Sequence, residues 1–151
     1  MTETFTDEYW MQLALQQARS ALQQDEVPIG AILVKDNQLV HADHNRTNQL
    51  KDPRAHAEKL VIDKVLDGGE KFLNKYTLYV TLEPCLMCAG MLIWSRLGRV
   101  VFGASDPKAG VVGSIYNVLQ DKSFNHRPKV KSGILEAECA SILRDFFRSK
   151  R

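Results

Sequence analysis

The chain lacks any long apolar run, internal repeat or low-complexity tract, and it has only three cysteines among its 151 residues. No segment approaches the roughly 20 apolar residues that a membrane-spanning helix needs. The first ten residues, MTETFTDEYW, are acidic and polar, whereas a secretory signal begins with basic and then apolar residues. We therefore expect a cytoplasmic protein that does not contact a membrane.

Cysteine is too scarce for a disulfide framework. Cys85, Cys88 and Cys139 make an odd number in a chain that we expect to remain in the cytoplasm. Two of them form a C-x-x-C pair. In a cytosolic protein such a pair indicates metal binding or redox chemistry far more often than a structural disulfide.

Charge of one sign is not in large excess, because the formal net charge is +2. Its distribution is uneven: from His126 onward there are seven basic residues against three acidic ones, so the C-terminal segment is basic and the remainder mildly acidic. A basic end of this kind is consistent with contact to a polyanion. It is equally consistent with a solvated helix end whose cations complement the helix dipole.

What the chain does contain is helical periodicity alternating with short apolar strands. In the first helix, Met11 and Leu15 recur at helical spacing, Thr6 is placed as N-cap, and Phe5 and Trp10 are placed for a hydrophobic staple. The pattern predicts helices over residues 5–24, 55–66, 85–95 and 136–148, and strands over 29–34, 39–44, 76–82 and 98–104.

Strands separated by helices indicate an α/β fold. We expect a single domain over residues 1–151, with helices on both faces of a mixed, mostly parallel sheet. The first two strands are close enough in sequence to form an antiparallel hairpin at one edge, with its turn at residues 35–37.

The C-x-x-C pair lies directly after a predicted strand. Pro84 occupies the position where a first helical turn would begin, which suits proline because its missing N–H would be unpaired there. Residues three apart share a helix face, so the sulfurs of Cys85 and Cys88 can point toward one object. The start of a helix also favours thiolates, the form that binds metal. This arrangement serves zinc and redox chemistry equally well.

The residues that distinguish a zinc site from a redox pair lie upstream, in DPRAHAEKL. His56, Cys85 and Cys88 supply three ligands, and three protein ligands leave the fourth position of zinc for water, the catalytic arrangement. Zinc makes hydroxide available near neutral pH, and Glu58 is then placed as the proton shuttle. A purely structural zinc site would want a fourth ligand, but Cys139 fits the apolar face of the last helix, so we expect it in the core.

Together, His56-Ala57-Glu58 and Pro84-Cys85-Leu86-Met87-Cys88 resemble the H-x-E…P-C-x-x-C signature of the zinc-dependent nucleobase deaminases. Four longer segments are similar to the bacterial tRNA-specific adenosine deaminases, and the resemblance extends from Phe5 to Arg148. They are EVPIGA, KDPRAHAE, TLEPCLMCAGMLIWSRLGRVVFGASDPKAG and NHRPKVKSGILEAECASILRDFFR.

The resemblance implies a cytidine-deaminase-like fold, a three-layer α/β/α sandwich around a five-stranded sheet, and a homodimer. It implies conversion of adenosine to inosine at the wobble position of a tRNA anticodon stem-loop. One zinc ion per subunit would be bound by His56, Cys85 and Cys88, with Glu58 as the catalytic residue.

The resemblance also implies a set of substrate contacts. Asn45 would hold the flipped nucleotide. The other implied contacts fall into three groups: Ile29, Ala57 and the backbone of Leu82 and Glu83 around the base; Asp106 and Lys108 at the sugar–phosphate; and Asn125, Arg127, Phe147 and Arg148 at the rest of the anticodon loop.

Two other functions remain as alternatives at this point. One is a deaminase of free guanine, adenine or cytidine, which would have no use for the basic C-terminal segment. The other is a zinc-containing RNA-binding subunit without turnover, which would have no use for Glu58. We further expect His41 and His44 to face solvent in the hairpin, and one of Phe146 and Phe147 to be buried while the other is exposed.

Overall fold

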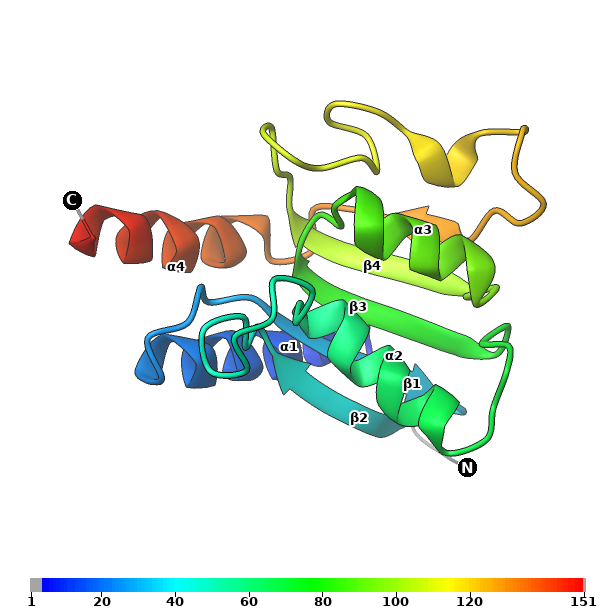
Figure 1. Cartoon of the computed structure of the whole chain (residues 1–151), viewed down its shortest axis with the longest axis horizontal. Coiled ribbons are helices and arrows are strands. Elements are labelled where there is room, and N and C mark those ends of the chain that lie inside the picture. Colours follow the sequence, from blue (N-terminus) through cyan, green and yellow to red (C-terminus); the bar gives the residue numbers. More distant parts are fainter. Residues whose placement is uncertain (1–3, 151) are drawn as a thin grey trace.

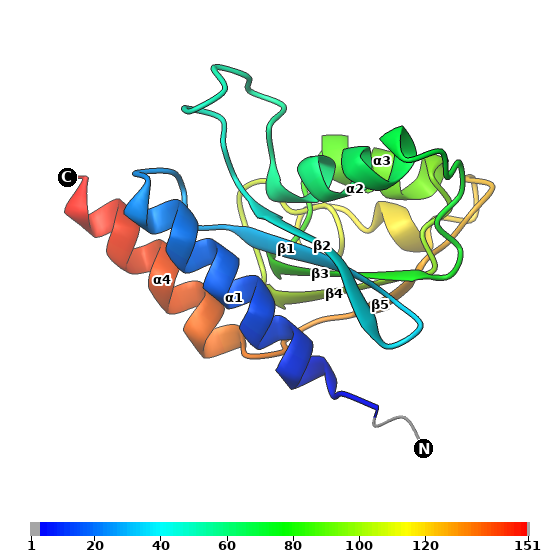
Figure 2. The ribbon, with the colours of Figure 1, turned by 90° about the horizontal axis from the view of Figure 1, so that it is seen from below.

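Residues 4–150 are described by a computed structural model, in which a five-stranded sheet lies between two pairs of helices (Figures 1 and 2). Its elements, in chain order, are α1 (Asp7–Gln23), β1 (Gly30–Lys35), β2 (Gln38–His44), α2 (Ala57–Asp67), β3 (Tyr76–Leu82), α3 (Leu86–Trp94), β4 (Arg99–Ala104), the 3₁₀ turn η1 (Val118–Gln120), β5 (Lys129–Lys131) and α4 (Glu136–Ser149). Every helix and strand predicted from the sequence pattern is present, with ends displaced by at most two residues.

The strand order is β2-β1-β3-β4-β5. Strand β1 is antiparallel to both of its neighbours, β2 and β3, while β3, β4 and β5 are mutually parallel. Only β1 therefore runs against the common direction, and the predicted mixed, mostly parallel sheet is confirmed. The carboxyl ends of β3 and β4 lie at the same edge of the sheet, where ligands bind in open α/β folds.

The turn of the hairpin and the beginning of the first helix follow from local chemistry. Asp36 and Asn37 both have positive φ, as a two-residue type I′ hairpin turn requires. Thr6 caps α1 by accepting a hydrogen bond from the backbone N–H of Tyr9. The rings of Phe5 and Trp10 meet edge to face at 5.4 Å, which confirms the predicted staple.

Both faces of the sheet are covered, and each face has its own apolar core. Figure 2 shows α1 and α4 side by side on one face, with α2 and α3 on the other. Successive residues of β1 alternate between the two cores: Leu33 packs under α2 and α3, while Ile32 packs under α1 and α4. Cys139 of α4 is fully buried in this second core, as its spacing predicted.

Two local expectations were wrong. Cys85, not Pro84, is the N-cap of α3, so the proline precedes the helix instead of opening it. His44 is buried instead of facing solvent, and its ring Nδ1 lies 2.9 Å from the carbonyl oxygen of Asn45. His41 is half-buried. No helix within residues 4–150 is long and apolar enough to cross a membrane.

Candidate active site

The ends of two helices bring together the three candidate metal ligands. His56 is the N-cap of α2 and Cys85 is the N-cap of α3, with Cys88 in the first turn of that helix. Nδ1 of His56 lies 3.6 Å from the Sγ of Cys85 and 3.6 Å from the Sγ of Cys88. All three ligand atoms lie within 4.8 Å of one another.

This donor set fits zinc in both geometry and chemistry. Tetrahedral zinc with Zn–S of about 2.3 Å and Zn–N of about 2.0–2.1 Å separates a nitrogen ligand from a sulfur ligand by roughly 3.6 Å, which is the separation seen from His56 to each cysteine. Two thiolates and one imidazole are also a typical zinc ligand set. The three residues could therefore hold the ion.

The two thiols have opposite electrostatic environments. A hydrogen bond from the Cys88 thiol lowers the pKa of Cys85 to about 4. That same hydrogen bond and burial raise the pKa of Cys88 far above its usual value. By themselves the two sulfurs thus retain one proton, whereas a bound dication would stabilise both as thiolates.

Glu58 lies beside these three residues and follows His56 by two positions in the chain. Its side chain is buried, with 4% of the residue exposed, and burial raises its pKa to about 7. A carboxyl group with a pKa near the working pH can both accept and donate a proton. The separation of roles between His56 as ligand and Glu58 as proton carrier is therefore compatible with the geometry.

A cavity of about 260 Å³ opens directly onto these residues. It is lined by Val27, Ile29, Asn45, Thr47, His56, Ala57, Glu58, Leu82, Glu83, Cys85, Asp106 and Ala109. Ligand pockets usually run from about 300 to 1,000 Å³, so this one suits a single base better than a larger group. Six of the predicted substrate contacts line it, and they come from five separate parts of the chain: Ile29, Asn45, Ala57, Leu82, Glu83 and Asp106.

Asn45 has an unused hydrogen-bond acceptor in this cavity. Its side chain is buried, and its Oδ1 has no hydrogen-bond partner among residues 4–150. Its Nδ2 makes only a long contact of 3.5 Å with the carbonyl oxygen of Val27. Buried polar groups are normally paired, so an unpaired acceptor that lines a cavity points to a donor group on a ligand.

The remaining predicted contacts lie outside the cavity. Lys108, Arg127, Phe147 and Arg148 are exposed, with Phe147 50% accessible and its neighbour Phe146 only 7% accessible. The expectation that one of these two phenylalanines is buried and the other exposed is confirmed. Exposed Asn125 lines a different groove, on the outer surface of α3. Arg151, part of the basic segment, lies outside the described residues.

The sequence reasoning missed several residues of the site. Val27, Thr47 and Ala109 line the cavity, but nothing distinguishes them from ordinary loop residues in the sequence. Glu26 is buried and its carboxylate accepts hydrogen bonds from the backbone N–H groups of residues 48 and 49, at 3.0 and 2.7 Å. It thereby holds the loop between Asn45 and His56, and the only sequence signal was a glutamate next to an apolar strand.

Comparison with known proteins agrees with this geometry. Residues 5–151 match the family model of the MafB19-like deaminases. The tRNA-specific adenosine deaminase of Bacillus subtilis (strain 168) is 47% identical over 146 residues, which cover 96% of this chain and 91% of that protein. The enzyme of the same name from Agrobacterium fabrum is 47% identical over 144 residues, covering 95% of each chain.

A solved structure from work on A-to-I editing by tRNA:A34 deaminases at the wobble position of transfer RNA superimposes with a TM-score of 0.85. It is 46% identical and covers 89% of this chain and 99% of its own. The three-layer fold, the grouped histidine and cysteines, and near full-length identity to named relatives agree with one another. The chain belongs to the deaminase family and, within it, to the tRNA-specific adenosine deaminases.

Proposed function

We propose that this protein hydrolyses adenosine to inosine at the wobble position of a tRNA anticodon, in the cytoplasm. The observation that carries the proposal is the convergence of His56, Cys85 and Cys88 beside a buried Glu58, at one end of a cavity of about 260 Å³. A site for free nucleosides would need the same chemistry. What favours RNA is the similarity to tRNA-specific relatives over at least 95% of the chain, including its basic C-terminal segment.

His56, Cys85 and Cys88 would hold one zinc ion per subunit. Zinc bound there supplies a Lewis acid that makes hydroxide available near neutral pH. The N-terminal ends of α2 and α3 face the same point, and their dipoles favour the anionic thiolates there. The ligands therefore need no additional positive side chain beside them.

Glu58 carries the proton in this mechanism. As a carboxylate it accepts one proton from the attacking water and passes it to the ring nitrogen N1. It then accepts the second proton from the hydroxyl group left on C6 and passes it to the departing amine. Adenosine and water thus become inosine and ammonia. In the metal-free site, burial raises the pKa of Glu58 to about 7.

The cavity walls would select and orient one base. Ile29, Ala57 and Leu82 contribute apolar surface, together with the chain at Glu83. Asn45 would accept a hydrogen bond from the flipped nucleotide through its unpaired Oδ1.

Contacts beyond the base would come from exposed residues around the cavity. Asp106 lines the cavity rim and Lys108 is exposed two residues later, so both are available to the sugar–phosphate of the target. The rest of the anticodon loop would meet four exposed residues: Asn125, Arg127, Phe147 and Arg148. Phe147 would stack on an unpaired base, and the cations would neutralise phosphates.

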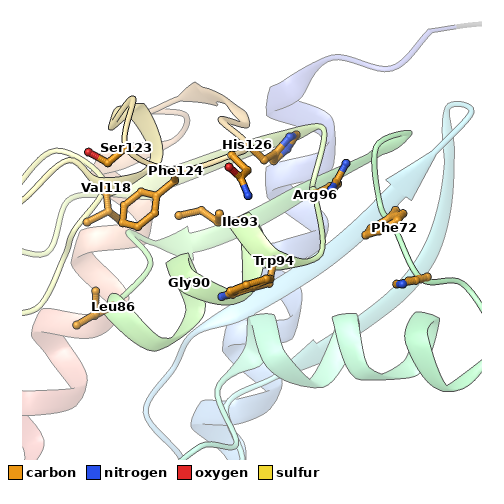
Figure 3. Close-up of a pocket in the computed structure, with 12 residues that line it drawn as sticks. Phe72, Leu86, Gly90, Ile93, Trp94, Arg96, Val118, Ser123, Phe124 and His126 are labelled. Carbon is orange, nitrogen blue, oxygen red and sulfur yellow. The ribbon is translucent and has the colours of Figure 1, made fainter.

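We also propose that the protein is a homodimer that associates through the outer surface of α3. Leu86, Gly90 and Trp94 follow one another at four-residue spacing along this surface, beside a groove of about 440 Å³ (Figure 3). Trp94 is 83% exposed and Leu86 is 65% exposed. A side chain at Gly90 would meet no atom of this chain within 4 Å, although glycine weakens a helix interior by about 1 kcal/mol.

Close approach by a helix outside this chain would explain both the glycine and the exposed tryptophan. A second copy offers a projecting Trp94 and a groove on the same surface, as a self-complementary twofold interface requires. Replacing Trp94 with Glu should convert the dimer into a monomer in analytical ultracentrifugation, while Tyr9→Glu on the surface of α1 should leave it dimeric. A Trp94→Glu protein that remains dimeric would refute this interface.

Deamination by the zinc-loaded protein across a substrate panel tests the proposed function. The panel contains an anticodon stem-loop with adenosine at the wobble position, its cytidine counterpart, and free adenosine, guanine and cytidine. We expect inosine only in the adenosine stem-loop. Turnover of a free base or nucleoside without deamination of the stem-loop would overturn the proposed substrate. No turnover of any substrate would favour a non-catalytic subunit.

A further inference from the structure

Glu83 stands between β3 and the first cysteine, and its side chain has no role in the chemistry described above. The residue is buried, with only 3% exposed. Its carboxylate faces the backbone of residues 106–114, the segment that follows β4 and is yellow-green in Figure 1. A carboxylate buried this deeply must be compensated by hydrogen bonds or charge.

Four hydrogen bonds provide that compensation, and all four come from this one segment. Oε1 accepts from the backbone N–H of Asp106 at 3.0 Å and from the hydroxyl of Ser114. Oε2 accepts from the backbone N–H groups of Val112 and Ser114, at 2.9 and 3.1 Å. One carboxylate therefore joins the beginning of the segment to its end.

Packing around the carboxylate is as close as its hydrogen bonding. A Cβ atom placed on Gly110 would lie 2.3 Å from Cδ of Glu83, well inside contact distance. Only glycine at this position lets the backbone of the segment fold around the carboxyl group. The segment also hydrogen-bonds to the next residue of the chain, because the N–H of Val111 donates to the carbonyl oxygen of Pro84 at 3.1 Å.

The segment held in this way forms one wall of the active-site cavity. Asp106 and Ala109 line the cavity, and Oδ1 of Asp106 accepts hydrogen bonds from the backbone N–H groups of Lys108 and Ala109, at 3.0 and 3.3 Å. The position of this wall therefore depends on the anchor of Asp106 to Glu83. On its other side, Glu83 is only two residues from Cys85.

We infer that Glu83 is a positioning residue: its carboxylate fixes the substrate-facing segment 106–114 at a set distance from the metal ligands, and thereby sets how tightly the target nucleotide is held. This inference rests on the proposed function, since it assumes that the segment contacts substrate. Glu83 itself does not touch the reacting atoms. Its oxygens are already occupied by the four donors.

Three variants disturb this anchor to different extents. Ser114→Ala removes the hydroxyl donor and leaves the three backbone donors in place. Glu83→Gln keeps the size of the side chain but has one acceptor oxygen instead of two, so at least one backbone N–H of the segment loses its partner. Gly110→Ala leaves the charge unchanged and displaces the carboxylate by steric overlap. Glu70→Gln, at an exposed ion pair with Lys35, is the matched control.

Amide hydrogen exchange of the zinc-loaded protein tests the anchor without any substrate. In Glu83→Gln and Gly110→Ala we expect exchange across residues 106–114 to accelerate about tenfold or more, the factor that corresponds to roughly one net hydrogen bond. Ser114→Ala should show a smaller change and Glu70→Gln none. The zinc content should stay at one per chain in all four. Unchanged exchange in both Glu83→Gln and Gly110→Ala would overturn the inference.

Steady-state kinetics on the wobble-adenosine stem-loop test its consequence. We expect KM to rise about tenfold in Glu83→Gln and Gly110→Ala while kcat falls less than threefold, because the ligands and Glu58 are untouched. Faster exchange with an unchanged KM would reduce Glu83 to a purely structural residue and refute its positioning role. If the wild-type protein leaves the stem-loop unchanged, the proposed function fails, whereas the exchange result still decides whether Glu83 anchors the segment.

Discussion

Nδ1 of His56 lies 3.6 Å from Sγ of Cys88, although the two residues are 32 positions apart in the chain. The contact exists because α2 and α3 begin at the same edge of the sheet, each directly after a loop. Both helices thus direct their N-terminal ends, and the residues that cap them, at one point. The same edge holds Glu58 and the cavity that we propose as the binding site of the base.

Glu58 is expected to be essential for turnover but not for the metal. Replacing it with Ala or with Gln, which keeps the size, should lower kcat by at least about 10²-fold, the usual contribution of a general acid–base group. Zinc content, measured by atomic absorption, should stay at one per chain. Either variant with near wild-type kcat would contradict the proton-shuttle role.

Replacing Cys88 and replacing Cys139 should have different effects on the metal content. Cys88→Ala removes a ligand, so the purified protein should lose both zinc and activity. Cys139→Ala changes a residue buried in the core under α1 and α4, so it should retain zinc and activity and lose only some stability. Zinc loss from the Cys139 variant would mean that this residue is a ligand after all.

Asn45 should contribute to binding and little to stability. Because its Oδ1 has no partner among residues 4–150, Asn45→Ala should shift the thermal midpoint only slightly. The KM for the stem-loop should rise by about 10- to 100-fold, as expected for losing one buried hydrogen bond to a ligand. Asn45→Asp, which keeps an acceptor oxygen of the same reach, should recover part of the affinity. An unchanged KM in Asn45→Ala would remove Asn45 from the binding site.

Asp7 should make the stability of the fold depend on acid pH. Hydrogen bonds from Arg99 hold the pKa of Asp7 well below its usual range, helped by Tyr79 and opposed by partial burial. Since the folded pKa is lower than the unfolded one, this carboxylate stabilises the fold above about pH 4 and the contribution is lost as the pH falls below that value.

Asp7→Asn should therefore lower the free energy of unfolding at pH 7 by about 1.5–3 kcal/mol, the worth of hydrogen bonds to a charged group. The deficit should shrink below pH 4, where the unfolded wild-type chain takes up a proton on this carboxyl group and the advantage of the folded carboxylate is lost. Urea unfolding between pH 3 and pH 7 measures it. Asp52→Asn, at an exposed pair with Arg54, should have little effect, and a deficit of Asp7→Asn that is constant across this range would contradict the assignment.

The adjacent phenylalanines of α4 should have separable effects. Phe146→Ala removes a buried ring and should destabilise the fold by about 3–5 kcal/mol. Phe147→Ala removes an exposed ring and should leave the thermal midpoint unchanged while weakening stem-loop binding by about 1–3 kcal/mol, the value of one base stacked on an aromatic ring. If stem-loop binding is unchanged in both variants, α4 is not part of the RNA interface.

The fold was predictable where the pattern is local. The staple of Phe5 on Trp10, the hairpin turn at Asp36 and Asn37, and the burial of Cys139 all depend on spacing along one or two elements. The grouping of His56 with Cys85 and Cys88 was predictable for a related reason. Each ligand stands at the start of a helix after a loop, so the sequence pattern indicates where the side chains point even though it does not give their separation.

What the sequence could not predict are contacts between distant loops and buried carboxylates. Glu83 appears in the sequence only as the residue before a proline, and nothing there indicates that it accepts hydrogen bonds from residues 23 to 31 positions later. Glu26 holds the other loop in the same way. The prediction that His44 faces solvent was wrong for a similar reason. A residue of an edge strand is expected to be exposed unless neighbouring parts of the chain are known to cover the end of that strand.

The most direct test of the account is the position of inosine in an anticodon stem-loop treated with the zinc-loaded protein. Two stem-loops are compared, one with adenosine at the wobble position and one with that adenosine moved by a single nucleotide, and the product is mapped by sequencing. The account predicts inosine at the wobble position of the first and none in the second. Equal deamination of both stem-loops would contradict it. So would deamination of free adenosine with no deamination of either stem-loop.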